Sequence, residues 1–186
     1  GCSRCHTHEG FMEFLLSGTD VVADNPTPVN CRTCHPIHES YDVSDYGLRV
    51  TEAVTLTSGD VVDMGTANIC ISCHQSRAIS PMPVVGGPDV EVTSSRFGPH
   101  HGPNANLIEG IGMYEFAGSM SYPSSNPHAL ENGCVTCHMS TPYGNQAGGH
   151  TFSIDYEYHC SMSVWDAGCV ECHTSGDFHD DLEASM

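Results

Sequence analysis

The sequence predicts a mostly irregular fold with a few short helices and a small β-hairpin, organised around a core that side chains alone do not provide. The 186 residues are 39% hydrophobic and include 19 Gly, 11 Pro and one Trp, so they supply few core-forming side chains. The recurring feature is a five-residue site, Cys-x-x-Cys-His (CxxCH), repeated at intervals of 29, 39, 64 and 35 residues. These intervals lack the constant period of a solenoid. With no linker between the sites, we expect one domain over residues 1–186.

Regular structure is expected in few places. Residues 10–18 (GFMEFLLSG) predict a short helix that ends at its last glycine. Residues 48–65 (LRVTEAVTLTSGDVVDMG) predict a hairpin, because β-branched residues alternate on either side of a Ser-Gly turn. Residues 104–118 (NANLIEGIGMYEFAG) predict another helix, interrupted at Gly110 and Gly112. Each CxxCH is expected on a turn of helix.

The repeated site has the spacing of covalent haem attachment. Two thiols three positions apart can add to the two vinyl groups of one haem, and the next imidazole then lies beneath the iron as its proximal ligand. Histidine makes up 13 of 186 residues, so its presence after all five pairs by chance is on the order of one in a million. The five motifs predict five haem c groups, and so a single pentahaem cytochrome c domain over residues 1–186 in which the haem stack is the core. Their thioether cysteines are Cys2, Cys5, Cys31, Cys34, Cys70, Cys73, Cys134, Cys137, Cys169 and Cys172, and their proximal histidines are His6, His35, His74, His138 and His173.

Other uses of paired cysteines fit less well. A zinc ribbon needs two CxxC pairs for each metal and has no use for the histidine, and five pairs do not divide by two. A disulfide framework has varied spacings instead of five identical short loops. Cys160 is the eleventh cysteine, and we expect a buried, inert thiol there, with an intermolecular disulfide or an unusual ligand as alternatives.

Eight further histidines exceed the five sixth-coordination positions that need a ligand. His8 and His38 closely follow their own proximal histidines and point to neighbouring haems, whereas four others lie in short Gly- and Pro-containing stretches that bend easily. The predicted distal ligands are His8, His38, His100, His101, His128 and His150. His159 and His179 rank lower, and Met is the rival ligand. An iron ligated by two histidines transfers electrons and does not readily bind a substrate, so no catalytic residue is expected.

Charge and hydropathy limit the partners. The formal charge of −18 would repel nucleic acid and anionic membrane surfaces. No apolar run approaches the length of a membrane span, so membrane insertion is not expected. Haem attachment through thioethers takes place outside the cytoplasmic membrane, so we expect an extracellular protein, or a periplasmic one if it is a carrier. Because the chain opens at Gly1-Cys2, inside a motif, its true start is expected upstream.

Several segments resemble one family. CHTHEGF, RFGPHHGPNANL and GCVTCHM followed by GGHTF are similar to the extracellular multihaem cytochromes that polymerise into filaments, particularly the tetrahaem type of these cytochrome nanowires. The resemblance implies a filament subunit with bis-His haems in stacked and T-shaped pairs, and one distal histidine supplied by the next subunit. On that reading the six candidates above match distal-ligand positions. The fifth motif departs from the tetrahaem pattern. It is therefore open which histidine would ligate a haem of the neighbouring subunit, and His8 is one candidate.

Three functions follow from these observations. The first is long-range electron transfer by a head-to-tail filament of identical subunits, exchanging electrons with redox proteins or extracellular minerals. The second is a soluble monomeric periplasmic electron carrier with the same haems. The third, a multihaem reductase, needs an open iron position and proton donors, whereas the chain has no Lys and only five Arg. We therefore expect no enzymatic activity.

Overall fold

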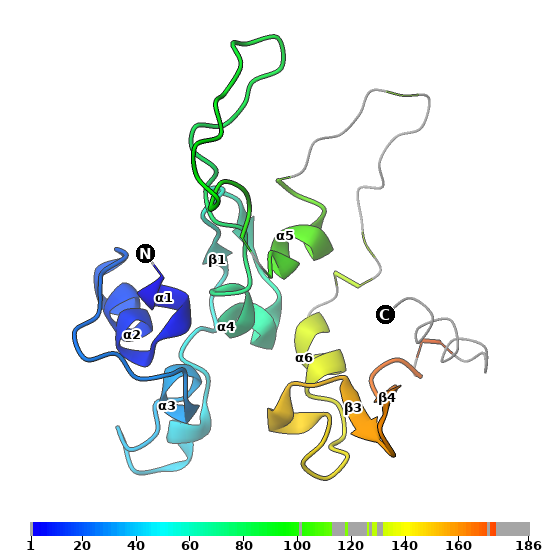
Figure 1. Cartoon of the computed structure of the whole chain (residues 1–186). Helices are drawn as coiled ribbons and strands as arrows, with labels where there is room; N and C mark the ends of the chain where they lie inside the picture. The colour runs from blue at the N-terminus through cyan, green and yellow to red at the C-terminus, as the bar shows by residue number, and fades with distance from the viewer. Residues whose placement is uncertain are drawn as a thin grey trace. The chain divides into compact units, whose positions relative to one another are not determined.

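A computed structural model of the chain describes residues 2–100, 102–112, 118, 126, 128–129, 132–170 and 172–173. The described residues are mostly coil, with short helices and two small antiparallel hairpins (Figure 1), which confirms the coarse prediction. The chain divides into two compact units, residues 1–131 and 132–186. A single pentahaem domain and a haem stack at its centre stay predictions.

The first motif and the helix that follows it form one tight pair. Helix α1 (Ser3–His6) contains the first motif, and α2 (His8–Ser17) begins where the Thr7 side chain accepts a hydrogen bond from the Gly10 amide. Helix α2 ends at Gly18 in a left-handed conformation, as predicted. A Cβ at Gly10 would lie 2.4 Å from the Ser3 backbone, so only glycine permits this approach of α2 to α1.

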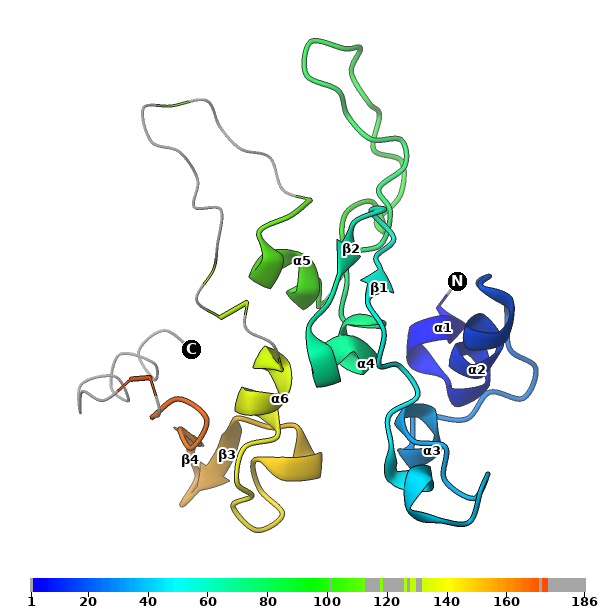
Figure 2. The ribbon, with the colours of Figure 1, turned by 180° about the vertical axis from the view of Figure 1, so that it is seen from behind.

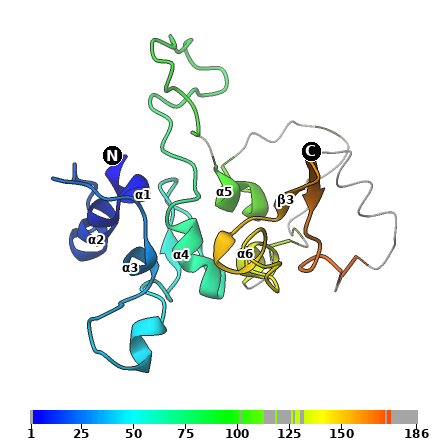
Figure 3. The same ribbon diagram turned by 60° about the horizontal axis from the view of Figure 1, so that its bottom comes forward.

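The second motif lies next to α2 (Figures 1 and 3). Helix α3 (Cys31–Cys34) is a single turn that begins with a capping box. The Asn30 side chain accepts a hydrogen bond from a backbone amide of the turn, and the Thr33 side chain accepts one from the Asn30 amide. A 3₁₀ turn, η1 (Val43–Tyr46), follows and is capped by Asp42. Capping therefore compensates for the small number of backbone hydrogen bonds that a one-turn helix can make.

The predicted hairpin is present and covers the third motif (Figure 2). Strand β1 (Val54–Thr55) pairs antiparallel with β2 (Val61–Val62), and η2 (Gly65–Ala67) leads into α4 (Asn68–Ile71). Most of the apolar core of this unit lies here, with Leu56, Met64 and Ile71 no more than 2% exposed. The hairpin thus gives the third motif the best-packed surroundings in the first unit.

A long excursion separates α4 from α5. Residues 78–97, which we name the arm, project from the body of the first unit (Figure 1). The arm is apolar at its turn, where Val84 and Val85 are 71% and 78% exposed. Helix α5 (Asn104–Glu109) then ends at Gly110 in a left-handed conformation, at the first of the two predicted interruptions, while residues 113–117 of the predicted helix lie outside the described residues.

The second unit contains the last two motifs and a hairpin that the sequence did not predict. Helix α6 (Gly133–His138) contains the fourth motif, and η3 (Gly149–Thr151) precedes strands β3 (Asp155–Tyr158) and β4 (Ser161–Val164). Their two-residue turn, His159 and Cys160, has positive φ at both positions, the geometry of a type I′ turn. Cys160 is therefore exposed at a hairpin tip, and the prediction of a buried thiol was wrong.

Apolar burial is sparse throughout the described residues. Eleven apolar side chains are buried, against eighteen large hydrophobic side chains that are exposed. None of the described helices has the length and apolar character needed to cross a membrane. The polypeptide therefore leaves much apolar surface uncovered, in line with the composition.

Candidate haem-attachment sites

The five motifs share a helical turn. In four of them a backbone hydrogen bond runs from the histidine amide to the carbonyl of the first cysteine, at 3.1 Å (His6), 3.0 Å (His35), 2.9 Å (His74) and 2.8 Å (His173). The fifth histidine, His138, is the last residue of α6. Because positions i, i+3 and i+4 lie on one face of a helical turn, both thiols and the imidazole of each motif share a face. One flat ligand can meet all three groups.

The motif side chains are open to solvent. None of the ten cysteines and five histidines of the motifs is buried, and all eleven cysteines of the chain are free thiols. Partial burial raises the pKa of Cys34, Cys134, Cys137 and Cys169. The face of each motif that carries the thiols and the imidazole is therefore accessible to a large flat group.

Two proximal histidines are oriented by backbone carbonyls. The ring nitrogen Nδ1 of His35 donates to the Gly47 carbonyl at 2.8 Å, and Nδ1 of His138 donates to the Phe152 carbonyl at 2.8 Å. A carbonyl can only accept, so Nδ1 carries a proton, and in the neutral imidazole Nε2 then has the lone pair. A ligating histidine that donates its other N–H to a carbonyl is the usual arrangement around a protein-bound metal. Both imidazoles are therefore prepared to bind a metal through Nε2.

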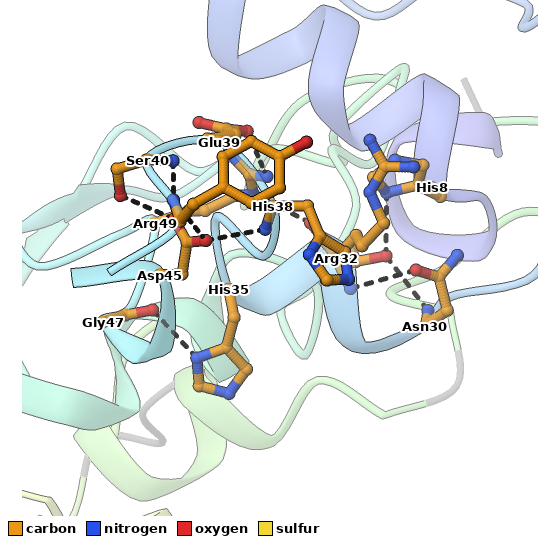
Figure 4. A network of polar contacts seen from close by, with 12 residues as sticks. His8, Asn30, Arg32, His35, His38, Glu39, Ser40, Asp45, Gly47 and Arg49 are labelled. Atoms are coloured by element: carbon orange, nitrogen blue, oxygen red, sulfur yellow. Dashed lines mark hydrogen bonds and ion pairs between the residues drawn. The ribbon is translucent and has the colours of Figure 1, made fainter. Parts of the chain in front are cut away.

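His8 contacts the second motif. Its Nδ1 lies 3.1 Å from the hydroxyl oxygen of Thr33, which also accepts a hydrogen bond from the Asn30 amide (Figure 4). His8 therefore belongs to α2 but is oriented by a side chain of the CRTC turn. Its position agrees with the idea that it serves a haem other than that of its own motif.

His38 is held by a buried carboxylate. Asp45, 6% exposed, accepts hydrogen bonds from the His38 amide at 2.8 Å, the Ser40 amide at 2.8 Å and hydroxyl at 2.7 Å, and the Tyr41 amide at 3.1 Å (Figure 4). These bonds, that from the Ser40 hydroxyl above all, lower the pKa of Asp45 to about 2, so the carboxylate stays ionised at neutral pH. His38 has φ of 67°, a left-handed conformation that is uncommon outside glycine.

The first and third motifs pack against each other. Nη2 of Arg4, in the first motif, donates to the carbonyl of Ser72, in the third, at 3.3 Å, and the Cys73 thiol lies 3.9 Å from the Arg4 carbonyl oxygen. The Cys73 thiol also hydrogen-bonds to Cys5, which is the main reason that the pKa of Cys5 falls to about 7 and that of Cys73 rises. Thiols of two motifs thus meet directly.

The fourth and fifth motifs are also adjacent. A Cβ at Gly168 would lie 2.4 Å from the Thr136 carbonyl oxygen and 2.8 Å from Cα of Cys137, so only glycine fits between the two turns. Burial raises the pKa of Cys137 and of Cys169, and charges across this contact raise them further, that of Cys172 acting on Cys137 and that of Cys137 acting on Cys169. Each unit therefore contains one close pair of motifs.

The remaining distal candidates lie in different surroundings. The ring of His100 lies 6.1 Å from that of the proximal His6, measured between centroids, with the planes tilted by 46°. His150 is in η3, and its ring is 5.9 Å from that of Phe152. His128 is exposed and its amide donates to the Asn126 side chain. His101 and the lower-ranked His179 lie outside the described residues.

The sequence did not reveal the groups that orient these histidines. Gly47 and Phe152 act through backbone carbonyls, which leave no side-chain signature, and Asp45 reads as one more acidic residue in a polar loop. Among the described residues, no three His, Cys, Asp or Glu side chains converge as ligands of one metal ion. Axial ligation of haem iron needs only two, one on each face.

Comparison with known proteins adds no further assignment. No family model, no curated protein and no solved structure matches this chain. The likeness to filament-forming cytochromes therefore rests on the segments quoted above, and the functional argument rests on the geometry of the five motifs.

Proposed function

We propose that this protein is an electron-transfer protein that binds five haem c groups, each with two histidine ligands, and that it forms the repeating subunit of an extracellular conductive filament. The observation that carries the proposal is the common face on which each motif presents two thiols and one imidazole, none of them buried. In two motifs the imidazole is also oriented by a hydrogen bond from its Nδ1 to a backbone carbonyl, which leaves Nε2 for the iron.

The residues have distinct roles in this proposal. The paired cysteines form thioethers, so the haems cannot dissociate, and the motif histidines bind the iron from one side. The carbonyls of Gly47 and Phe152 fix the ring orientation of His35 and His138. Each bound haem supplies a one-electron Fe(III)/Fe(II) couple. The contacts between motifs 1 and 3, and between motifs 4 and 5, hold two pairs of attachment points close together, as electron transfer between haems requires.

A protein without enzymatic activity fits the same residues best. Distal histidines at every iron leave no position for a substrate. Arg4 is buried between two motifs and Arg49 pairs with Glu39 at 2.6 Å, so these two cations are engaged structurally. We accordingly assign the chain no catalytic residues.

Assembly into a filament is supported by the family likeness and by the arm. A head-to-tail contact that does not close into a ring gives a filament. The exposed Val84 and Val85 at the turn of the arm form an apolar projection of the kind that marks interaction surfaces. The acidic surface, with a formal charge of −18 for the chain, suits a protein that stays soluble after secretion.

The test of haem binding is mass spectrometry and spectroscopy of the protein purified from its native host. We expect the intact mass of the polypeptide plus five haems, and oxidised spectra in which every iron is low-spin. Absence of covalent haem would overturn the proposal. A high-spin iron in the unmodified protein would contradict bis-His ligation at that site and favour a reductase instead.

A further inference from the structure

The pairing of one distal histidine with one haem can be argued from geometry, given the proposed haem binding. We infer that His6 and His100 are the two axial ligands of a single iron, that of the haem attached to Cys2 and Cys5. The first observation is the separation of their rings, 6.1 Å between centroids. Two imidazoles on opposite sides of one metal ion have centroids about 6 Å apart, since each metal–nitrogen bond is about 2 Å and each centroid lies about 1 Å beyond its nitrogen.

The second observation is that the chain is held by hydrogen bonds before His100, at Gly98 and Pro99, and after it, at Ala105. The Gly98 carbonyl accepts from Nε of Arg77 at 2.9 Å, and the Pro99 carbonyl accepts from the Arg77 amide at 3.1 Å. At the other end, the Ala105 amide donates to the His74 carbonyl at 2.9 Å. The segment is thus anchored on the third motif, and His100 extends from it towards the first motif.

The third observation concerns the third motif, which this segment also touches. The Cβ position of Gly102 lies 3.6 Å from Nδ1 of His74, so the segment passes beside the Nδ1 edge of that ring. An iron bound through Nε2 would lie at the other edge, and its second axial ligand further away still. This placement favours His6 over His74 as the axial partner of His100.

The backbone of His100 supports a functional role. Its φ of 76° is a left-handed conformation that L side chains adopt rarely and that clusters at ligand-holding positions. Pro99 and Gly102 on either side make the tight course of the chain possible. In this conformation the His100 ring lies 6.1 Å from the His6 ring, measured between centroids.

One structural consequence is that the first and third haem sites are interlocked. A segment anchored on the third motif supplies the distal ligand of the first site, while Arg4 of the first motif donates to the Ser72 carbonyl of the third. Binding of the first haem would therefore fix His100 and Pro99 as well as residues 2–6. The two sites are expected to form together.

The experiment uses the purified holoprotein with His100→Ala and His100→Met. We expect His100→Ala to convert one iron of five from low-spin to high-spin by electron paramagnetic resonance. His100→Met should keep all five irons low-spin, show the charge-transfer band of a thioether–iron bond, and raise one of the five midpoint potentials. His159→Ala, in the exposed turn between β3 and β4, is the matched control and should leave all five irons unchanged.

A variant lacking the first haem, Cys2→Ala/Cys5→Ala/His6→Ala, identifies the iron. In that background His100→Ala should add no high-spin signal. The inference is overturned if high-spin iron appears there to the same extent, or if His100→Ala and His100→Met both leave five unaltered bis-His spectra in the full protein. Since the unmodified protein would still hold five haems, failure of this pairing is distinct from failure of the proposed function.

Discussion

Single residues decide how each imidazole is presented. A histidine binds metal through Nε2 only if its ring is turned and its proton is on Nδ1, and this chain meets both conditions with acceptors from neighbouring loops. Asp45 acts on the backbone and not on the ring, because its carboxylate accepts from the amide of His38, which has a left-handed conformation. Asp45 also lies two residues before Gly47, the partner of His35. One loop therefore positions two candidate ligands.

Replacement of Asp45 by asparagine should loosen this loop. The amide NH₂ of Asn would face backbone N–H donors where a carboxylate oxygen now accepts, so at least one of the four hydrogen bonds is lost. We expect a lower thermal midpoint and a high-spin fraction from the iron that His38 ligates. Calorimetry and visible spectroscopy measure the two effects. Asp89→Asn, on the exposed arm, is the control, and equal behaviour of the two variants would contradict this role of Asp45.

Arg4 is the residue most able to tune haem potentials. Its side chain is 7% exposed, lies 3.6 Å from the Phe14 ring centroid, and stands between the first and third motifs. A buried cation stabilises a reduced iron, so Arg4→Met should lower the potentials of the neighbouring haems. The expected shift is on the order of tens of millivolts, for a unit charge about 10 Å away at an effective dielectric constant of about 20.

Redox titration of Arg4→Met against Arg96→Met tests this point. Arg96 is exposed, so its charge is screened by solvent and its loss should shift no potential appreciably. A rise in potential for Arg4→Met, or equal shifts in both variants, would show that Arg4 does not act through its charge.

At the scale of elements, the sequence predicted the local structure that follows from local rules. The helix ending at Gly18, the hairpin around the Ser-Gly turn and the stop at Gly110 all depend on glycine or on alternation, which a sequence displays directly. The β3–β4 hairpin was missed because its turn is His-Cys, residues that only rarely adopt the paired positive φ values of a type I′ turn. The same turn explains why Cys160 is exposed instead of buried.

Contacts between motifs were beyond sequence reasoning, because they depend on which turns meet in space. Gly168 marks the contact between the fourth and fifth motifs, and Gly10 that between α2 and the first motif, yet each reads in the sequence as one glycine among 19. Their lack of a side chain is required by the backbone that lies against them. The spacing of the motifs along the chain carries no information about such neighbours.

The contact between the fourth and fifth motifs gives a prediction for Gly168→Ala. Its Cβ would overlap the backbone of Thr136 and Cys137, so the two turns must separate. Overpacking of this kind costs about 1–3 kcal/mol. We expect a lower unfolding midpoint by chemical denaturation, with haem content unchanged. Gly118→Ala is the control, because no atom lies within 4 Å of its Cβ position, and an equal loss of stability there would contradict the packing argument.

At the scale of the whole molecule, the polypeptide lacks enough buried apolar surface to act as its own core. The exposed hydrophobic side chains outnumber the buried apolar ones among the described residues, and about 37 residues serve each of five motifs. Under the proposed haem binding, five bound groups would supply the apolar contacts that the side chains do not.

The arm provides a way to separate assembly from electron transfer. Val84→Asp together with Val85→Asp places two charges at its apolar turn and should prevent filament formation, while the five-haem spectrum stays intact. Light scattering and visible spectroscopy report the two properties. Val22→Asp, at a side chain that is 88% exposed outside the arm, is the control, and filaments of normal length from the double variant would exclude the arm from assembly.

The central claim is that this chain forms a continuous path of bis-His haems through a polymer, and electron cryomicroscopy of the native protein tests it most directly. We predict long uniform fibres, with five haems in each subunit, density for two histidines at every iron, His100 opposite His6, and haem spacing that continues across the subunit boundary. Dispersed single subunits with the same five haems would contradict the polymer and identify a soluble carrier. Particles without haem would contradict the account as a whole.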